Sequence, residues 1–192
     1  MRIGLYGGTF DPIHHGHLLL AREALEQLGL DELLFVPAWH SPHKPDIRIT
    51  PGPIRVEMIR AAIAGEPGLA VDDREIRRGG LSYAIETVRE LQTELPDAEF
   101  HYLIGADNLP ALHTWREIGE LRRRVRFVVL ARHGEEDASG FPVIRRPLAI
   151  SSTEIRNRVA KGESVRYFLP QEVIAIIARH HLYRTPPSLP KP

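Results

Sequence analysis

The sequence predicts an α/β fold, a doubly wound parallel sheet with helices on both faces, in a single domain. Three observations support this class. Short apolar runs alternate along the chain with longer stretches whose apolar residues recur at helical spacing, which is the pattern of repeated strand and helix units. The chain has 192 residues, enough for one domain with its own core. The first apolar run leads directly into a glycine pair and then into a helical pattern.

Each expected element follows from apolar spacing and from local start and stop signals. Strands are expected at residues 1–6, 32–36, 69–71, 99–104 and 124–131. Helices are expected at 15–29, 53–65, 83–95, 114–121, from 150 onward and at 170–180. Five prolines in residues 37–53 predict a long loop, and loops of this length are often functional. The domain is expected to span residues 1–184, followed by a frayed proline-rich tail at 185–192.

Composition excludes several classes of function. The 25 Lys and Arg residues balance 25 Asp and Glu residues, so no global field draws the protein to nucleic acid or an anionic membrane. The absence of cysteine excludes disulfides, thiolate nucleophiles and Cys-ligated zinc. No apolar run approaches the ~18 residues of a membrane span, and residues 1–8 lack the apolar stretch of a signal peptide. We therefore expect a cytoplasmic protein, with its oligomeric state left open.

The first strand-to-helix loop, residues 7–17 (GGTFDPIHHGH), is placed to bind an anion. Glycines let backbone N–H groups approach a phosphate beside the positive end of a helix. His14 and His17 are three residues apart and share a helix face, so both imidazoles could donate to triphosphate oxygens or, alternatively, bind a metal. Gly7-Gly8 could also be only a tight turn. The loop matches neither the P-loop nor the usual dinucleotide pattern.

A second candidate anion site is the start of a late helix, residues 150–156 (ISSTEIR). Its hydroxyls, its free N–H groups and Arg156, one turn into the helix, are suited to phosphate oxygens. Ser151 and Glu154 also form the pattern of a capping box, which starts helices without any ligand. Both interpretations can hold, because Ser152 and Thr153 are not needed for the cap.

These two loops resemble the H-x-G-H and I-S-S-T-x-I-R elements of the nucleotidyltransferase superfamily, in which a nucleotide triphosphate is attacked at its α-phosphorus and pyrophosphate leaves. The resemblance implies a Rossmann-like nucleotidyltransferase fold. Four further stretches are similar to its bacterial nicotinate mononucleotide branch, the nicotinate-nucleotide adenylyltransferase family: residues 37–44 (PAWHSPHK), 79–87 (GGLSYAIET), 104–115 (IGADNLPALHTW) and 128–134 (VVLARHG). The resemblance thus covers nearly the whole chain.

The resemblance implies the following site. The catalytic residues are expected to be His14, His17 and Arg156. Residues expected to bind ATP are Gly7, Gly8, Thr9, Phe10, His14, His17, Gly105, Asp107, Arg132, Ile150, Ser151, Ser152, Thr153 and Arg156. Residues expected to bind the acceptor are Gly8, Thr9, Lys44, Ser82, Tyr83, Ala84, Asp107 and Trp115. Mg²⁺ is expected as the cofactor, held mainly by the triphosphate rather than by a protein metal site.

Trp115 and residues 82–84 (SYA, where the family more often has S-Y-T) select the acceptor in this interpretation. A planar nicotinate ring can stack on the indole, whereas the alternative is that Trp115 anchors a capping box of Thr114 and Glu117. In the family the pyridine carboxylate is held largely by main-chain N–H groups around S-Y-T and the Trp. The chain departs from the family pattern at four positions, which carry Ser41, Ala84, Glu86 and His133.

The expected activity is transfer of the adenylyl group of ATP to nicotinate mononucleotide by direct in-line displacement, giving deamido-NAD and pyrophosphate. Alternatives within the same chemistry are nicotinamide-mononucleotide and pantetheine-phosphate adenylyltransferases, and the latter should not need the 37–44 loop or Trp115. A catalytically silent nucleotide sensor is a third possibility, disfavoured because it could lose His14, His17, Ser152 and Arg156 freely. The basic run at 122–124 is most simply a solvated helix end.

Overall fold

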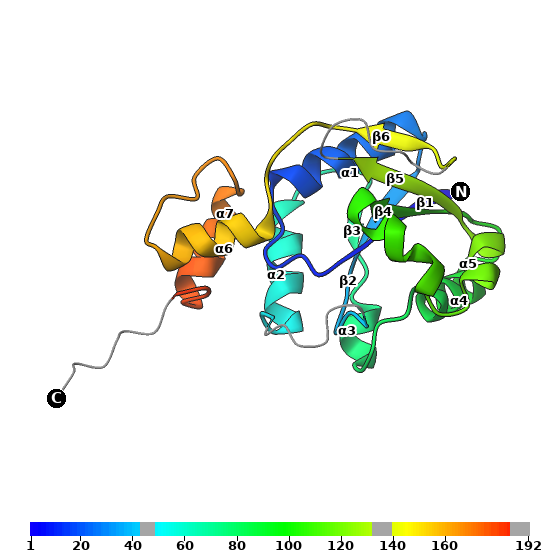
Figure 1. Ribbon diagram of the computed structural model, residues 1–192, viewed down its shortest axis with the longest axis horizontal. Helices are drawn as coiled ribbons and strands as arrows, with labels where there is room; N and C mark the ends of the chain where they lie inside the picture. The colour runs from blue at the N-terminus through cyan, green and yellow to red at the C-terminus, as the bar shows by residue number, and fades with distance from the viewer. Residues whose placement is uncertain (43–48, 132–139, 185–192) are drawn as a thin grey trace.

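The computed structural model describes residues 1–42, 49–131 and 140–184, and in this part of the chain six parallel strands form one sheet. The order across the sheet is β3-β2-β1-β4-β5-β6 (Figure 1). The strands are β1 (Arg2–Gly8), β2 (Glu32–Pro37), β3 (Leu69–Val71), β4 (Glu99–Gly105), β5 (Arg126–Ala131) and β6 (Val143–Arg145). The predicted α/β class with a parallel sheet is therefore confirmed.

Helices connect the strands and cover both faces of the sheet. They are α1 (His15–Gln27), α2 (Gly52–Ala62), α3 (Arg74–Arg78), α4 (Ala84–Glu94), the 3₁₀ helix η1 (Ala106–Thr114), α5 (Ile118–Arg124), α6 (Ser152–Ala160) and α7 (Gln171–Arg179). Among the described helices, none is long and apolar enough to cross a membrane.

The strands separate two apolar cores because successive side chains of a strand point to opposite faces. In β4, Leu103 packs toward the core made with α1, α2, α6 and α7, whereas Phe100, Tyr102 and Ile104 pack toward the core made with η1, α4 and α5. Each core includes fully buried side chains from the central strands β1 and β4 or from the strands next to them. In Figure 1, α6 and α7 lie at one end of the molecule, where α7 packs against α2.

The strong helical patterns are confirmed with small shifts in their ends, and three short elements were not predicted. These are α3, with five residues, β6, with three, and η1, which contains Pro110. Each is too short, or too proline-interrupted, to show an apolar period in the sequence. The strand predicted at 124–131 begins at Arg126, because α5 continues to Arg124.

The helix predicted at 114–121 is wrong in its first half. Thr114 ends η1, and Trp115 has extended backbone angles (φ −65°, ψ 139°). Glu117 lies in the left-handed region (φ 52°) as the N-cap of α5, with no side-chain cap hydrogen bond. The Thr114 hydroxyl instead donates to the carbonyl of Ala111 at 2.7 Å, so the capping box of Thr114 and Glu117 does not form. The tail at 185–192 lies outside the described residues.

Candidate active site

The strand order places a crevice at the carboxyl ends of β1 and β4. The chain passes from β1 to β2 and β3 on one side and from β4 to β5 and β6 on the other, so the connections leave these two central strands in opposite directions. Ligands of open α/β sheets bind at such a point. Two neighbouring cavities open here, and they share lining from Gly7, Gly8, Thr9, Ala38, Ser41 and Asn108. They therefore form one cleft with two lobes.

The first lobe, called here the histidine lobe, has a volume of about 310 Å³. Both predicted anion loops reach it, the first with Thr9, Phe10 and His17 and the second with Ser152 and Arg156. The full set of predicted ATP-binding residues that line it is Gly7, Gly8, Thr9, Phe10, His17, Gly105, Asp107, Ser151, Ser152, Thr153 and Arg156. Two loops that are 140 residues apart in the sequence, counted from Pro12 to Ser152, thus line the same cavity.

Glycine is required at positions 7 and 8 because neighbouring side chains lie very close to the backbone there. An added Cβ at Gly7 would lie 2.7 Å from the Tyr102 hydroxyl oxygen, and one at Gly8 would lie 2.9 Å from the ring of Phe10. No side chain fits at either position without displacing its neighbour. The backbone therefore lies directly at the cleft wall, where its N–H groups can meet an anion.

His14 and His17 cap α1 reciprocally. The Nδ1 of His14 accepts from the backbone N–H of His17 at 3.4 Å, and the Nδ1 of His17 accepts from the backbone N–H of His14 at 3.3 Å. The two rings are stacked, with centroids 3.7 Å apart. Because each Nδ1 is an acceptor, the ring proton of each neutral imidazole is on Nε2. His17 lines the histidine lobe, whereas His14 is fully buried beneath it.

The start of α6 is fastened to the first loop. Ser151 is the N-cap, and its hydroxyl oxygen accepts from the backbone N–H of Glu154 at 3.1 Å, which is one of the two hydrogen bonds of the predicted capping box. Ser152 Oγ donates to the carbonyl of Pro12 at 2.9 Å. Arg156 Nη1 donates to the carbonyl of Asp11 at 2.7 Å, and its Nη2 donates to Thr153 Oγ1 at 3.2 Å. The start of α6 is therefore both capped by Ser151 and bonded to the first predicted anion loop.

A buried polar network, not predicted from the sequence, supports the cleft from below. Arg55 is fully buried and donates to the carbonyls of Thr50 at 2.8 Å and Thr9 at 2.6 Å. Desolvation by burial lowers its pKa, and the nearby charge of Asp11 opposes that shift. Asp11 accepts from the Thr50 backbone N–H at 3.1 Å and from the Tyr183 hydroxyl at 2.5 Å. No sequence pattern indicated this network, because most of its contacts join distant segments.

The second lobe, called here the tryptophan lobe, has a volume of about 340 Å³. The predicted acceptor-binding residues Ser82, Tyr83, Ala84 and Trp115 line it, as does the departure position Ser41. The indole of Trp115 is held edge-on by Tyr102, with ring centroids 5.8 Å apart. The turn before α4 is pinned by Ser82, whose N–H donates to the carbonyl of His40 at 2.9 Å and whose Oγ accepts from the Trp39 N–H at 2.9 Å.

Some predicted residues lie elsewhere. Ile150 precedes the α6 cap and is not among the residues that line either lobe. Lys44, Arg132 and the departure position His133 lie outside the described residues. Glu75, Asn108 and Tyr102 line the cleft but were not predicted. Asn108 belongs to the 104–115 stretch that carries part of the resemblance, whereas Glu75 lies on the unpredicted helix α3.

The alternative that His14 and His17 bind a metal ion requires further ligands, and the described residues offer no third one. Within residues 1–42, 49–131 and 140–184, no group of three or more His, Asp or Glu side chains is placed to hold a metal ion. The Nδ1 atoms of both imidazoles are occupied by the reciprocal cap. The two histidines therefore cap α1, and His17 also lines the histidine lobe.

The parallel sheet, the two fastened anion loops and the aromatic lobe at the switch point define a nucleotide-binding α/β protein, and a cytidylyltransferase-like family model matches residues 5–158. Relatives extend this match along the chain. A probable nicotinate-nucleotide adenylyltransferase of Shouchella clausii is 46% identical over 185 residues, covering 95% of this chain and 96% of the relative. One of Opitutus terrae is 44% identical over 193 residues, covering 96% and 98%. The chain belongs to the nicotinate-nucleotide adenylyltransferase family.

Solved structures share the fold. The nicotinic acid mononucleotide adenylyltransferase of Plasmodium falciparum, complexed with NaAD, superposes with a TM-score of 0.79 at 22% identity, covering 95% of this chain and 97% of that one. The same enzyme complexed with APC gives a TM-score of 0.76 at 20% identity, covering 95% and 96%. At these identities the likeness supports the fold alone.

Proposed function

We propose that the protein transfers the adenylyl group of ATP to nicotinate mononucleotide, forming deamido-NAD and pyrophosphate. The observation that carries this proposal is the two-lobed cleft. Its histidine lobe offers two anion loops to a triphosphate, and its tryptophan lobe, which shares the Gly7 to Thr9 wall, offers an aromatic surface to a planar ring. Relatives at 40–46% identity that carry the name of this activity support the same substrates.

The reaction needs no protein nucleophile. A phosphate oxygen of the mononucleotide attacks the α-phosphorus of ATP, a new P–O bond forms, and the bond to the leaving pyrophosphate breaks. The protein's contribution is then alignment of the two nucleotides and stabilisation of charge on the leaving group. The shared wall between the lobes is where the acceptor phosphate and the α-phosphate would meet.

The residues divide this work by position. The Nε2–H of His17 and the guanidinium of Arg156 would donate to phosphate oxygens in the histidine lobe, together with backbone N–H groups of Gly8 to Phe10. His14 acts on the site through His17, by stacking on its ring and capping the same helix. Ser152 and Thr153 would complete the cradle at the start of α6.

Mg²⁺ fits this lobe as a cation carried by the triphosphate. Mg²⁺ is commonly held by one or two carboxylates together with substrate phosphates, and Asp107 lines the lobe. When bound, the ion would supply neutralisation of triphosphate charge. Asp11 also lines the lobe, but its carboxylate oxygens are committed to Thr50 and Tyr183.

The acceptor ring would occupy the tryptophan lobe. Trp115 offers an indole for stacking, and α4 begins at Ala84 with no side-chain cap on its first N–H groups. Such N–H groups are suited to a carboxylate, so we propose that the backbone around residues 82–84 holds the nicotinate carboxyl group. A cytoplasmic location is part of the proposal.

The test is formation of product. With ATP, Mg²⁺ and nicotinate mononucleotide, deamido-NAD and pyrophosphate should appear in equal amounts, measured by mass spectrometry and a pyrophosphate assay. ATP that is chiral at a thio-substituted α-phosphorus should react with inversion, because one in-line displacement inverts the centre. Absence of deamido-NAD would reject the function, and retention of configuration would reject direct displacement.

A further inference from the structure

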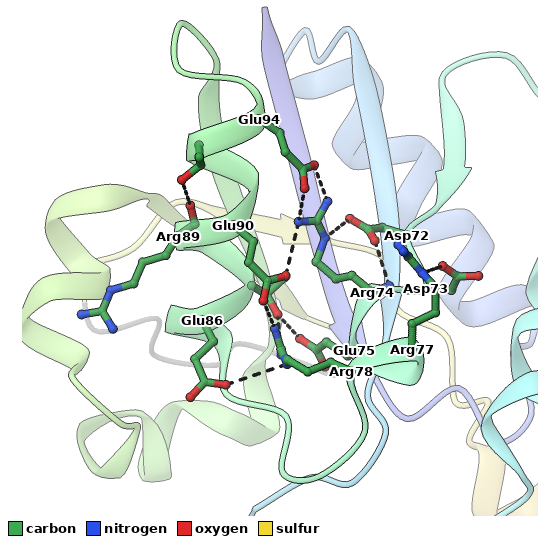
Figure 2. Close-up of polar contacts among 12 residues, drawn as sticks. Asp72, Asp73, Arg74, Glu75, Arg77, Arg78, Glu86, Arg89, Glu90 and Glu94 are labelled. Atoms are coloured by element: carbon green, nitrogen blue, oxygen red, sulfur yellow. Dashed lines mark hydrogen bonds and ion pairs between the residues drawn. The ribbon is translucent and has the colours of Figure 1, made fainter.

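A buried carboxylate faces the tryptophan lobe. Glu75 of α3 is only 5% exposed, yet it is among the residues that line this cavity. Figure 2 shows it beside Arg78, close to α4. Carboxylates are almost never this buried unless their charge is used or paired. Neither the proposed transfer step nor the anion loops use it.

The hydrogen bonds around Glu75 converge on it as an acceptor. The Thr87 hydroxyl donates to Glu75 Oε1 at 2.5 Å, and Thr87 Oγ1 in turn accepts from Arg78 Nη2 at 3.3 Å. The Ser82 hydroxyl also bonds Glu75, while its oxygen accepts from the Trp39 N–H at 2.9 Å. Two donor chains therefore end on the same carboxylate, which is the arrangement that favours its ionised form.

The groups around Glu75 only partly offset the burial of its carboxyl group. Burial raises the pKa of Glu75, and the Thr87 and Ser82 hydroxyls and the charge of Arg78 act in the opposite direction without cancelling it. The charge of Glu75 also contributes, after burial, to raising the pKa of Tyr102, whose ring lines the same lobe. A cation entering the lobe would oppose this effect of burial and favour the ionised form of the Glu75 carboxyl group.

The other charge of the lobe is at its rim. Among the described residues lining this cavity, the charged side chains are Glu75 and Arg116. Arg116 is half exposed, lies 4.6 Å from the centroid of the Tyr83 ring, and pairs with Glu86 at 2.8 Å. Arg116 at the rim is thus paired with Glu86. Glu75, at the buried end, makes no ion pair with a described residue, and the charge of Arg78 acts on it without direct pairing.

The proposed acceptor carries the complementary charge. Attachment of ribose to the pyridine nitrogen makes the ring a permanent cation, which titration does not remove. An aromatic lobe with Trp115 and a buried carboxylate is suited to such a ring, because both indole faces and carboxylates attract cations. We propose that Glu75 recognises the positive charge of the N-ribosylated pyridine ring and so selects acceptor nucleotides whose ring is cationic. This inference rests on the proposed function.

The experiment compares two acceptors that differ in ring charge. Nicotinate mononucleotide has a cationic ring, and its 1,4-dihydro form has a neutral ring with the same phosphate and carboxylate. With saturating ATP and Mg²⁺, Glu75→Gln should lower kcat/KM for the cationic nucleotide by about tenfold or more, mainly by raising KM. The same substitution should change kcat/KM for the dihydro form by less than about threefold. The substitution keeps the size of the side chain and an oxygen that can accept from Thr87.

Thr87→Val is the matched control. It removes the same hydrogen bond to Glu75 but leaves the charge in place, so it should change kcat/KM for both acceptors by a similar factor. Glu75→Asp, which restores a carboxylate, should recover part of the discrimination. Equal losses for both acceptors in Glu75→Gln would overturn the inference and leave Glu75 with a structural role only.

Failure of the proposed function gives a different result. A wild-type protein that turns over neither acceptor would reject that function, whereas an active wild type with equal losses in the variant rejects only the role of Glu75. Titration calorimetry of the wild type keeps the inference testable should Glu75→Gln not fold. The cationic nucleotide should then bind about tenfold more tightly than the dihydro form, and equal affinity would overturn the inference.

Discussion

His14 and His17 have two tasks that depend on the same atoms. Their Nδ1 atoms close the first turn of α1, and this fixes the ring protons on Nε2, where the His17 donor can meet a phosphate. Spacing in the sequence predicted that both residues share a helix face beside an anion loop. It could not predict that His14 would be fully buried while His17 lines the cleft, because this depends on packing against distant strands.

His17→Ala should lower kcat by about 10²-fold or more, because a donor to developing phosphate charge is lost. It should also lower the free energy of unfolding by about 1 kcal/mol through loss of half of the cap. Steady-state pyrophosphate release and urea unfolding measure the two effects. The control is His15→Ala, since His15 is not among the lobe-lining residues and should retain most activity. A His17→Ala protein with kcat close to that of wild type would remove His17 from the mechanism.

At the scale of elements, ion pairs between α3 and α4 lie beside the tryptophan lobe. Figure 2 shows the carboxylates of α4 reaching Arg74 and Arg78 of α3. Arg74 bonds Asp72 at 2.6 Å and Glu94 at 2.8 Å. The long amphipathic helices were predictable from apolar spacing. The short helix α3 was not, because five residues held by ion pairs leave no apolar period.

The contact between α4 and α5 should be sensitive to acid. Arg89 of α4 bonds Glu120 of α5 at 2.5 Å, and this hydrogen bond, with one from Arg124, lowers the pKa of Glu120 to about 2. The ordinary pKa of about 4.3 applies to the unfolded chain. Because the folded pKa is the lower one, the stabilisation is present above about pH 4.3 and is lost as the pH falls toward about 2.

Glu120→Gln should remove this pH dependence. The difference between wild type and variant in the urea midpoint should be largest near neutral pH and should shrink across the acid range, measured by circular dichroism. A difference that stays constant with pH would show that the pairing of Glu120 with Arg89 and Arg124 does not contribute in solution.

At the scale of the whole molecule, the site depends on contacts that join distant segments. The two loops were predictable because each carries its own local pattern of glycines, histidines or hydroxyls. The buried contacts that support these loops were not predictable, because Arg55, Asp11 and Tyr183 lie far apart in the sequence and only the fold brings them together. Glu75 was missed for the same reason, since its burial depends on the packing of α3 against α4.

Arg55→Met should destabilise the protein by about 3 kcal/mol, because the carbonyls of Thr50 and Thr9 lose a buried donor. Arg60→Met, on the same helix, is the matched control. Arg60 is 62% exposed and pairs with Asp73, so its loss should cost less than about 1 kcal/mol. Urea unfolding monitored by tryptophan fluorescence measures both. Equal small effects would mean that Arg55 does not hold the loops together.

One cleft is proposed to bring ATP and nicotinate mononucleotide together for adenylyl transfer. The most direct test is pyrophosphate release from ATP and Mg²⁺ with nicotinate mononucleotide, nicotinamide mononucleotide and phosphopantetheine offered separately, comparing kcat/KM for each. We expect strong preference for the nicotinate substrate. Equal use of the two pyridine nucleotides would contradict the carboxylate site at residues 82–84. Preference for phosphopantetheine, or no release with any acceptor, would contradict adenylyl transfer to nicotinate mononucleotide in this cleft.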